Sequence, residues 1–269
     1  MKSPTILCVH AHPDDEALFT AGASSYYADE GHRLVLVTCT YGQLGIDGAG
    51  RAGNIEGHDD LDTRANRAGE LQRAGALCGF ERQVSLGYRD SGMAGWASHA
   101  HQDAFVNVDV ERAARQLAAI IDAEEAAVVI TYDENGFYGH PDHVSAHRVT
   151  RRAVELSASA ERLFYPVIPR RVLAEFVERA RAAHLSMPAW VTDATLDTED
   201  DDVAVALDVR HRASLKQRAI ALHATQIDNA DLVTMSADLF ELLFGVEYYR
   251  LGWSRAAASP LSNLVEGLS

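Results

Sequence analysis

The chain has 269 residues, of which 47% are hydrophobic and 23% charged, and its formal net charge is −15 at pH 7. This composition predicts an ordinary globular protein, and the excess negative charge disfavours nucleic acid as a partner. No apolar run approaches the roughly 18–20 residues that span a bilayer, and the N-terminus lacks a signal-peptide pattern. We therefore expect a cytoplasmic protein that binds a small molecule and no membrane.

Short apolar runs alternate with amphipathic segments along the first 150 residues. The apolar runs predict buried strands at 5–10, 33–40, 82–88 and 127–133. The segments beside them predict helices at 15–30, 62–79, 108–123 and 141–157. Alternation of this kind predicts an α/β fold that is Rossmann-like, with a mostly parallel sheet and helices on both faces.

The pattern is less regular after Pro166 and Pro169. There we expect helices at 170–183 and 211–227, strands at 189–195, 203–209 and 247–252, and a solvated turn at the acidic run 198–202. No linker sets this part apart from what precedes it. The chain is therefore predicted to be a single domain, 1–269, in which a Rossmann-like metal-binding core (1–160) is completed by a mixed α/β extension (161–269).

The tripeptide His-Pro-Asp occurs twice, at 12–14 and at 140–142. Proline at the first helical position and aspartate in the first turn favour the start of a helix, but this does not account for the histidines. Each tripeptide lies between a predicted strand and a predicted helix. Both should therefore lie at the carboxyl edge of the parallel sheet, where ligands of open α/β sheets bind.

The side chains at these two corners, imidazoles and carboxylates, are of the types that commonly bind zinc. Near the first corner are His12, Asp14 and Asp15, and at the second the spacing of His140, His143 and His147 puts them on one helical face. A lone histidine or a single helix-start acid usually has only a structural role. A His-x-x-Asp pair from one corner with a histidine from the other, however, would supply three protein ligands of a catalytic zinc.

The two motifs resemble those of the PIG-L/LmbE-like zinc-dependent de-N-acetylases, A-H-P-D-D-E and H-P-D-H, which stand here at 11–16 and 140–143. The resemblance covers residues 5–155 well and the remainder loosely. Further stretches are most similar to the mycothiol-pathway branch of the family, namely 66–71, 86–95, 129–143 and 223–226. The resemblance implies a hydrolase that removes an N-acetyl group from an amino-sugar conjugate such as N-acetylglucosaminyl-inositol.

By position, the resemblance also implies roles for individual residues. The zinc ligands would be His12, Asp15 and His143, a set that iron(II) can also occupy, and Asp14 would be the general base. Around them, His140 would stabilise the oxyanion or act as an acid, Asp142 would orient His140, Tyr138 would lie near the scissile carbonyl, Arg67 and Asp90 would hold sugar hydroxyls, and Met93 would border the substrate pocket.

Other functions remain open from the sequence alone. The same chemistry would serve a mycothiol S-conjugate amidase, which cleaves a cysteinyl amide, or a deacetylase of another acetylated sugar. The loop YGQLGIDGAGRAGN, at 41–54, departs from the more acidic version of the family and so leaves the aglycone undetermined. A non-catalytic zinc-dependent binding protein is an alternative of a different class, although it would have no need of Asp14.

A glycine motif in the same loop suggests dinucleotide binding only weakly. Residues 48–53, GAGRAG, match G-x-G-x-x-G, but no strand directly precedes them and no helix follows at once to bind a pyrophosphate. We expect residues 41–60 to form a loop that covers the substrate. The three cysteines, Cys8, Cys39 and Cys78, are expected as buried thiols of a reducing compartment. His10, His99, His101 and His147 receive no role from the sequence.

Overall fold

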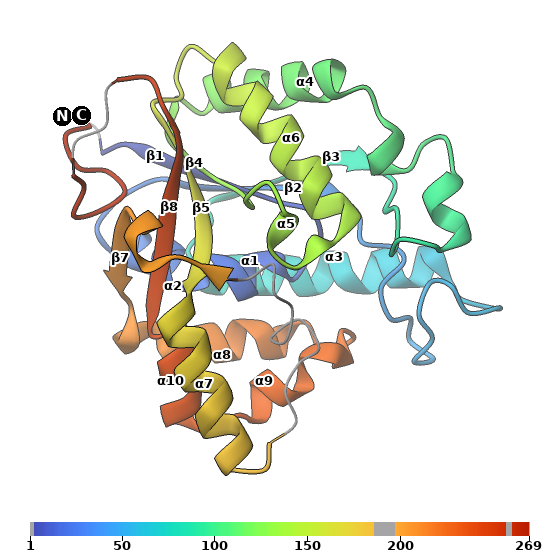
Figure 1. Ribbon diagram of the computed structural model, residues 1–269. Helices are drawn as coiled ribbons and strands as arrows, with labels where there is room; N and C mark the ends of the chain where they lie inside the picture. The colour runs from blue at the N-terminus through green and yellow to red at the C-terminus, as the bar shows by residue number, and fades with distance from the viewer. Residues whose placement is uncertain (1–2, 186–196, 257–259, 269) are drawn as a thin grey trace.

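A computed structural model describes residues 3–185, 197–256 and 260–268 of the chain (Figure 1). Its sheet has the strand order β3–β2–β1–β4–β5–β8–β7, and β6 pairs with β5 off this path. The strands are β1 (Thr5–His10), β2 (Leu34–Thr40), β3 (Arg82–Tyr88), β4 (Ala126–Ile130), β5 (Arg162–Pro169), β6 (Asp197–Thr198), β7 (Val205–Asp208) and β8 (Val246–Ser254). From β3 to β5 all neighbours are parallel, whereas β8 is antiparallel to β5 and β7. The predicted α/β class is confirmed.

Helices cover both faces of this sheet. They are α1 (Asp15–Phe19), α2 (Ala21–Asp29), α3 (Asp60–Leu77), α4 (Val110–Ala123), α5 (Gly136–Gly139), α6 (Pro141–Leu156), α7 (Arg170–Ala182), α8 (Ala213–Leu222), α9 (Ala230–Thr234) and α10 (Ala237–Phe244). Short 3₁₀ turns are Ala97–Ala100, Phe105–Asn107, Asp200–Asp202, Arg210–Arg212 and Ile227–Asn229. Figure 1 shows α4 and α6 on one face and α1, α2 and α3 on the other, with α8 packed beneath the second group. None of the described helices combines the length and apolar character that a membrane crossing requires.

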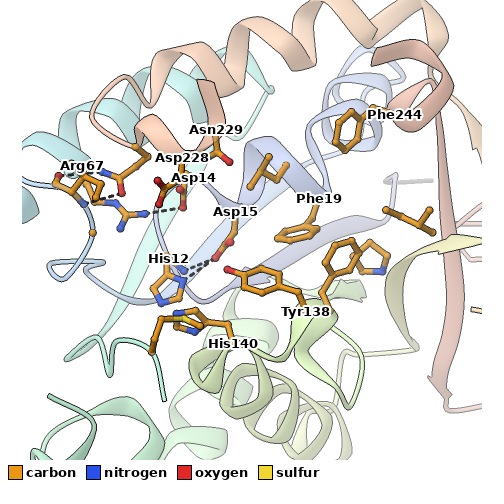
Figure 2. A pocket seen from close by; sticks show the side chains of 18 of the residues that line it. His12, Asp14, Asp15, Phe19, Arg67, Tyr138, His140, Asp228, Asn229 and Phe244 are labelled. Carbon is orange, nitrogen blue, oxygen red and sulfur yellow. Dashed lines mark hydrogen bonds and ion pairs between the residues drawn. The ribbon is translucent and has the colours of Figure 1, made fainter. Parts of the chain in front are cut away.

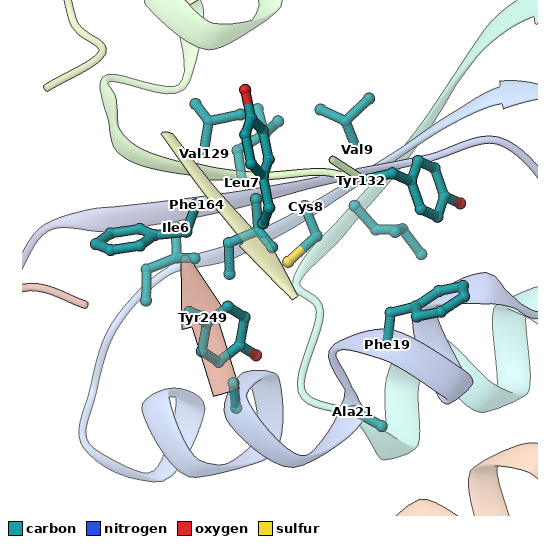
Figure 3. Packing of buried hydrophobic residues seen from close by; sticks show 14 of the residues in the cluster. Ile6, Leu7, Cys8, Val9, Phe19, Ala21, Val129, Tyr132, Phe164 and Tyr249 are labelled. Atoms are coloured by element: carbon teal, nitrogen blue, oxygen red, sulfur yellow. The ribbon is translucent and has the colours of Figure 1, made fainter. Parts of the chain in front are cut away.

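The core lies between these helical layers and the central strands. Every residue of β1 and β2 is buried, because a parallel strand covered on both faces has no solvent side. Figure 3 shows β1 residues such as Ile6 and Cys8 packed with Phe164 of β5 and Tyr249 of β8. The strands of the C-terminal part therefore share one core with the N-terminal strands. The three cysteines are free and buried, as predicted.

Several predicted elements differ from those in the structure. The helix predicted at 15–30 is divided at Thr20, whose φ of −134° leaves the helical region and whose Oγ1 lies 2.9 Å from His10 Nε2. The helix predicted at 211–227 ends at Leu222, and the short helices α9 and α10 follow. Strand β5 was not predicted. The strand predicted at 189–195 lies outside the described residues.

The strand order places a topological switch point beside β1. Strand β2 lies on one side of β1 and β4 on the other, so the segments that leave the carboxyl ends of β1 and β4 diverge to opposite faces of the sheet. A crevice at such a point is the usual ligand site of an open α/β sheet. Both His-Pro-Asp segments follow these two strands.

Candidate metal centre and active site

Asp15 lies at the centre of the first corner. Its Oδ2 accepts hydrogen bonds from the backbone N–H of His12 (2.7 Å) and from the Tyr132 hydroxyl (2.7 Å), and its Oδ1 lies 3.4 Å from His143 Nε2. Burial raises the pKa of a carboxyl group, but His143 and His12 outweigh this effect and hold the pKa of Asp15 well below its usual range. Asp15 is therefore a buried carboxylate shared between two histidines.

His143 presents a bare nitrogen to this carboxylate. Its ring stacks on Tyr132 with centroids 4.0 Å apart, and its Nδ1 lies 3.2 Å from the Gly136 carbonyl oxygen. Because a carbonyl oxygen only accepts, the proton is assigned to Nδ1 and the lone pair to Nε2. That Nε2 is buried and has no hydrogen-bond partner among the described residues. A buried, unpaired lone pair beside a carboxylate is the arrangement expected of a metal ligand.

His12 bridges the two corners. Its Nδ1 lies 3.4 Å from Asp15 Oδ2, and its Nε2 lies 3.2 Å from Asp142 Oδ2. Asp142 is fully buried and also accepts hydrogen bonds from the Ser91 backbone N–H (2.9 Å) and the Ser91 hydroxyl (2.5 Å). A histidine that donates one N–H to a carboxylate and keeps its other nitrogen for a cation is typical of metal centres.

The surroundings of His12 also require positive charge. Although burial lowers the pKa of a histidine, Asp90, Asp142 and Asp15 outweigh it and raise the pKa of His12 well above its usual value. Buried carboxylates in such number are stable only when a proton or a cation compensates them. The donor set thus fits a divalent cation.

In the part of the chain that the structure describes, two groups of side chains place their ligand atoms within 4.8 Å of one another: His12, His140 and His143, and His12, Asp90 and Asp142. The two corners are therefore brought together. The hydrogen bonds of His140 indicate whether it can act as a ligand. His140 Nδ1 accepts from the Asp142 backbone N–H (3.1 Å), so its proton is assigned to Nε2, which makes it a donor rather than a ligand.

The prediction for Asp142 and His140 needs a correction. Asp142 was expected to orient His140. Its carboxylate instead contacts His12 and Ser91, and only its backbone N–H reaches His140. Burial, together with His12 and His143, lowers the pKa of His140 well below its usual value. His140 is accordingly a neutral imidazole at the start of α6.

Asp14 points away from these pairs and toward Arg67. Its Oδ1 accepts from Arg67 Nη2 at 2.8 Å, and its backbone N–H donates to Glu16 Oε2 at 3.0 Å. Its φ of 122° is uncommon for a non-glycine residue and marks a backbone held in place by its surroundings. Burial outweighs the opposing effect of Arg67 and raises the pKa of Asp14 to about 6, which suits a base near neutral pH.

The residues predicted to hold the substrate line one cavity of about 330 Å³ (Figure 2). Arg67 is only 4% exposed, and its guanidinium donates to the carbonyl oxygens of Gly42 and Pro13 as well as to Asp14. Asp90 accepts from the backbone N–H groups of Gly92 (2.8 Å) and Leu44 (3.2 Å). Met93 also lines this cavity. Their roles toward a sugar stay predictions.

Tyr138 lies between the histidines and the apolar part of the cavity (Figure 2). Its ring centroid is 5.0 Å from that of His143. Burial raises the pKa of the phenol well above its usual value, so Tyr138 stays a hydrogen-bond donor. The preceding Phe137 has a φ of 65°, and such a value in a bulky residue marks backbone strain next to the site.

The sequence did not assign roles to several residues that support the site. Tyr132 and Ser91 fix Asp15 and Asp142. His223 Nε2 lies 2.6 Å from Glu16 Oε1, so the C-terminal part reaches the helix that carries Asp15. The signal for Tyr132 is its place just after the buried strand β4, whereas a pairing over 207 positions, such as Glu16 with His223, has no local signal.

The loop 41–60 forms a wall of the same cavity through Leu44, Gly45, Ile46 and Ala52. Asp47 organises it by accepting hydrogen bonds from the backbone N–H groups of Ala49 (2.9 Å) and Arg51 (2.8 Å). No helix begins in the loop until Asp60. The GAGRAG segment therefore lacks the helix N-terminus that a dinucleotide site requires.

The fold and site together define an α/β protein with a histidine–carboxylate centre at the carboxyl edge of its parallel sheet. The chain belongs to the PIG-L: GlcNAc-PI de-N-acetylase family, whose model matches residues 7–154. It is 37% identical over 267 residues to a 1D-myo-inositol 2-acetamido-2-deoxy-alpha-D-glucopyranoside deacetylase of Thermobifida fusca (strain YX), covering 93% of each chain. This confirms the family that the two motifs predicted.

Solved structures show the same fold at low sequence identity. The N,N'-diacetylchitobiose deacetylase from Pyrococcus horikoshii aligns with a TM-score of 0.61 and 18% identity, covering 93% of this chain and 84% of that one. The zinc-inhibited form of teicoplanin deacetylase Orf2 aligns with a TM-score of 0.61 and 16% identity, covering 92% and 97%. At these identities the likeness concerns the fold alone.

Proposed function

We propose that this chain is a zinc-dependent N-deacetylase that removes the acetyl group from N-acetylglucosaminyl-inositol, and that it acts in the reducing cytoplasm. The observation that carries the proposal is the 37% identity to a deacetylase of that substrate over 93% of both chains. Such coverage includes the cavity walls supplied by both the N-terminal and the C-terminal parts. The site supplies the groups that amide hydrolysis requires.

The proposed zinc ligands are His12 through Nδ1, Asp15, and His143 through Nε2. The bare Nε2 of His143 and the donation of His12 Nε2–H to Asp142 support this set over one that includes His140. Zinc bound there would lower the pKa of a water ligand and polarise the amide carbonyl. Three protein ligands leave a position for that water.

The remaining groups of the chain move protons and stabilise charge. The Asp14 carboxylate takes a proton from the attacking water, and a pKa of about 6 suits this role. Neutral His140, through Nε2–H, and the Tyr138 hydroxyl donate hydrogen bonds to the carbonyl oxygen as it becomes negative. Asp14 then returns its proton to the nitrogen as the C–N bond breaks, so acetate and the amino sugar are released.

The test separates metal binding from turnover. The Asp14→Asn variant should keep the wild-type zinc content and lose about 10²–10⁴-fold in kcat, because a positioned general base contributes that much. The Asp15→Asn variant should lose zinc as well. Zinc is measured by elemental analysis, and release of the free amine is measured with N-acetylglucosaminyl-inositol, free N-acetylglucosamine and a mycothiol conjugate. Absence of amine release from all three compounds by the zinc-loaded protein would instead favour a binding protein.

A further inference from the structure

The cavity has two chemically different halves on opposite sides of Asp15. In Figure 2, Arg67, Asp14 and Asp228 lie on one side of Asp15, and Phe19, Tyr138 and Phe244 on the other. The first half offers charged and polar groups that suit sugar hydroxyls. In the second half, Phe19 packs against Phe137 with ring centroids 4.7 Å apart. Further apolar residues that line the cavity are Pro166, Ile168 and Val246.

The apolar half is built by elements from across the chain. Phe19 belongs to α1, Ile168 to β5, Phe244 to α10, and Val246 to β8. The three larger hydrophobic residues are between 7% and 8% exposed, so each is nearly covered yet borders the cavity. Their convergence from four elements makes this half a formed part of the pocket.

The charged residues that border the apolar half are already paired. Lys216 Nζ lies 2.7 Å from Glu247 Oε1. Glu247 also accepts from the backbone N–H groups of Gly22 and Ala23 (both 2.9 Å) and from the Tyr249 hydroxyl (2.7 Å). Because the hydrogen-bonding capacity of Glu247 is filled, this ion pair does not require a polar group of a ligand. The second half of the cavity therefore keeps its apolar character.

Substrate chemistry assigns an occupant to this half. If the scissile amide lies beside His12, Asp15 and His143, its two substituents extend in opposite directions. The nitrogen substituent, the sugar, then meets the polar half, and the acyl carbon substituent meets the apolar half. An acetyl group has a single methyl there, which touches only a small part of a surface contributed by four elements.

We propose, on the basis of the amide hydrolysis proposed above, that the site accepts N-acyl amino sugars whose acyl group carries an apolar chain longer than acetyl. The chain lies along Phe19, Phe137, Ile168 and Phe244. Burial of each added methylene against such a surface should raise kcat/KM roughly threefold to fourfold until the half is filled. The cysteinyl acyl group of a mycothiol S-conjugate would enter the same space.

The experiment compares N-acetyl-, N-butanoyl-, N-hexanoyl- and N-octanoylglucosamine with the zinc-loaded protein. Release of the free amine gives kcat/KM, and calorimetry gives Kd for the same compounds with the Asp14→Asn variant. We expect kcat/KM to rise at least tenfold from acetyl to hexanoyl, with a matching fall in Kd. A mycothiol S-conjugate in the same series distinguishes an aliphatic chain from a cysteinyl group.

A filling substitution provides the structural control. Val246 is half-buried at the cavity wall, so Val246→Phe should occupy the space of a longer acyl chain and abolish the gain in kcat/KM from acetyl to hexanoyl. Val84→Phe, at a half-buried valine of β3 that does not line the cavity, should behave like the wild type. Cleavage of the acetyl substrate with kcat/KM falling steadily as the chain lengthens would overturn the acyl assignment. Absence of all cleavage would overturn the deacetylase function instead, and Kd would still decide the acyl assignment.

Discussion

Asp14 and Asp15 are chain neighbours with opposite properties. Asp15 is enclosed by His12, His143 and the Tyr132 hydroxyl, and its pKa is held low. Asp14 lies on a strained backbone beside Arg67, and burial raises its pKa to about 6. Two carboxylates whose environments separate their pKa values in this way are suited to different tasks, one as a ligand and one as a base.

Tyr132 gives a test of how the carboxylate ligand is held. The Tyr132→Phe variant removes the hydroxyl that donates to Asp15 and accepts from the Ala11 backbone N–H. Metal affinity should fall about 10–100-fold, as is typical when a partner of a ligand is lost. Zinc affinity is measured by competition with a chelator. The matched control is Tyr249→Phe, a buried tyrosine that bonds to Glu247, and equal affinities in both variants would argue against the role of Tyr132.

His140 gives a second test at this scale. In the His140→Asn variant the amide oxygen can still cap α6 by accepting from the Asp142 backbone N–H, as His140 Nδ1 does now. The donor aimed at the carbonyl oxygen is lost. We expect kcat to fall about 10²–10³-fold, with KM and zinc content changing little. A steady-state analysis with metal determination checks this, and an unchanged kcat would remove His140 from the chemistry.

The convergence of the two His-Pro-Asp corners could be predicted from the sequence because each motif is local. His12, Asp15, His140 and His143 lie at two helix starts, and the strand–helix alternation places both starts at one sheet edge. The hydrogen-bond partners of these residues were harder to predict from the sequence. Whether Asp142 serves His140 or His12 depends on packing between α6 and the segment containing Ser91, which neither motif encodes.

At the scale of elements, the segment after α8 ties the C-terminal part to the site. His223 pairs with Glu16 of α1, Thr225 donates to Glu70 of α3 through its backbone N–H and its hydroxyl (both 2.8 Å), and Gln226 accepts from the Ile46 backbone N–H (3.3 Å). The helix predicted at 211–227 wrongly included this segment because the polar residues of the segment fit helical spacing. Their long-range hydrogen bonds favour the irregular backbone instead.

The His223 pair should make stability depend on pH. Burial lowers the pKa of a histidine, but Glu16 outweighs it and raises the pKa of His223 above its usual value. The stabilisation is therefore complete below about pH 6.5, the pKa of an unfolded histidine, and is lost as pH rises through the raised folded pKa. His223→Gln should cost about 1–3 kcal/mol at pH 6.

Urea unfolding of the wild type and His223→Gln at pH 6, 7, 8 and 9 tests this dependence. The difference in free energy of unfolding should shrink as pH increases. His184→Gln is a suitable control because His184 is exposed at the end of α7. A difference that is constant over this range would show that His223 contributes by shape and hydrogen bonding without its charge.

At the scale of the whole molecule, the strands on either side of β5 were predictable, whereas β5, which joins the parallel and the antiparallel parts of the sheet, was not. β1, β2 and β4 are buried on both faces and are recognisable as apolar runs. β5 contains Pro166 and Pro169, which usually indicate that a strand is interrupted. Its pairing with β8 joins residues such as Tyr165 and Arg250, and a single sequence has no local signal for partners so far apart.

Because the proposed ligands come from both corners of the sheet edge, metal binding should stabilise the whole molecule. Zinc at about 100 times its Kd would add about 2.7 kcal/mol to the free energy of unfolding. For a domain of this size, that corresponds to a rise in Tm of roughly 5–10 °C. Calorimetric scans of the chelated and the zinc-loaded protein measure the difference. His143→Ala should abolish the shift because it removes the bare Nε2, whereas His101→Ala, an exposed histidine outside the cluster, should preserve it. Equal Tm values for the chelated and loaded wild type would contradict a zinc site shared by the two corners.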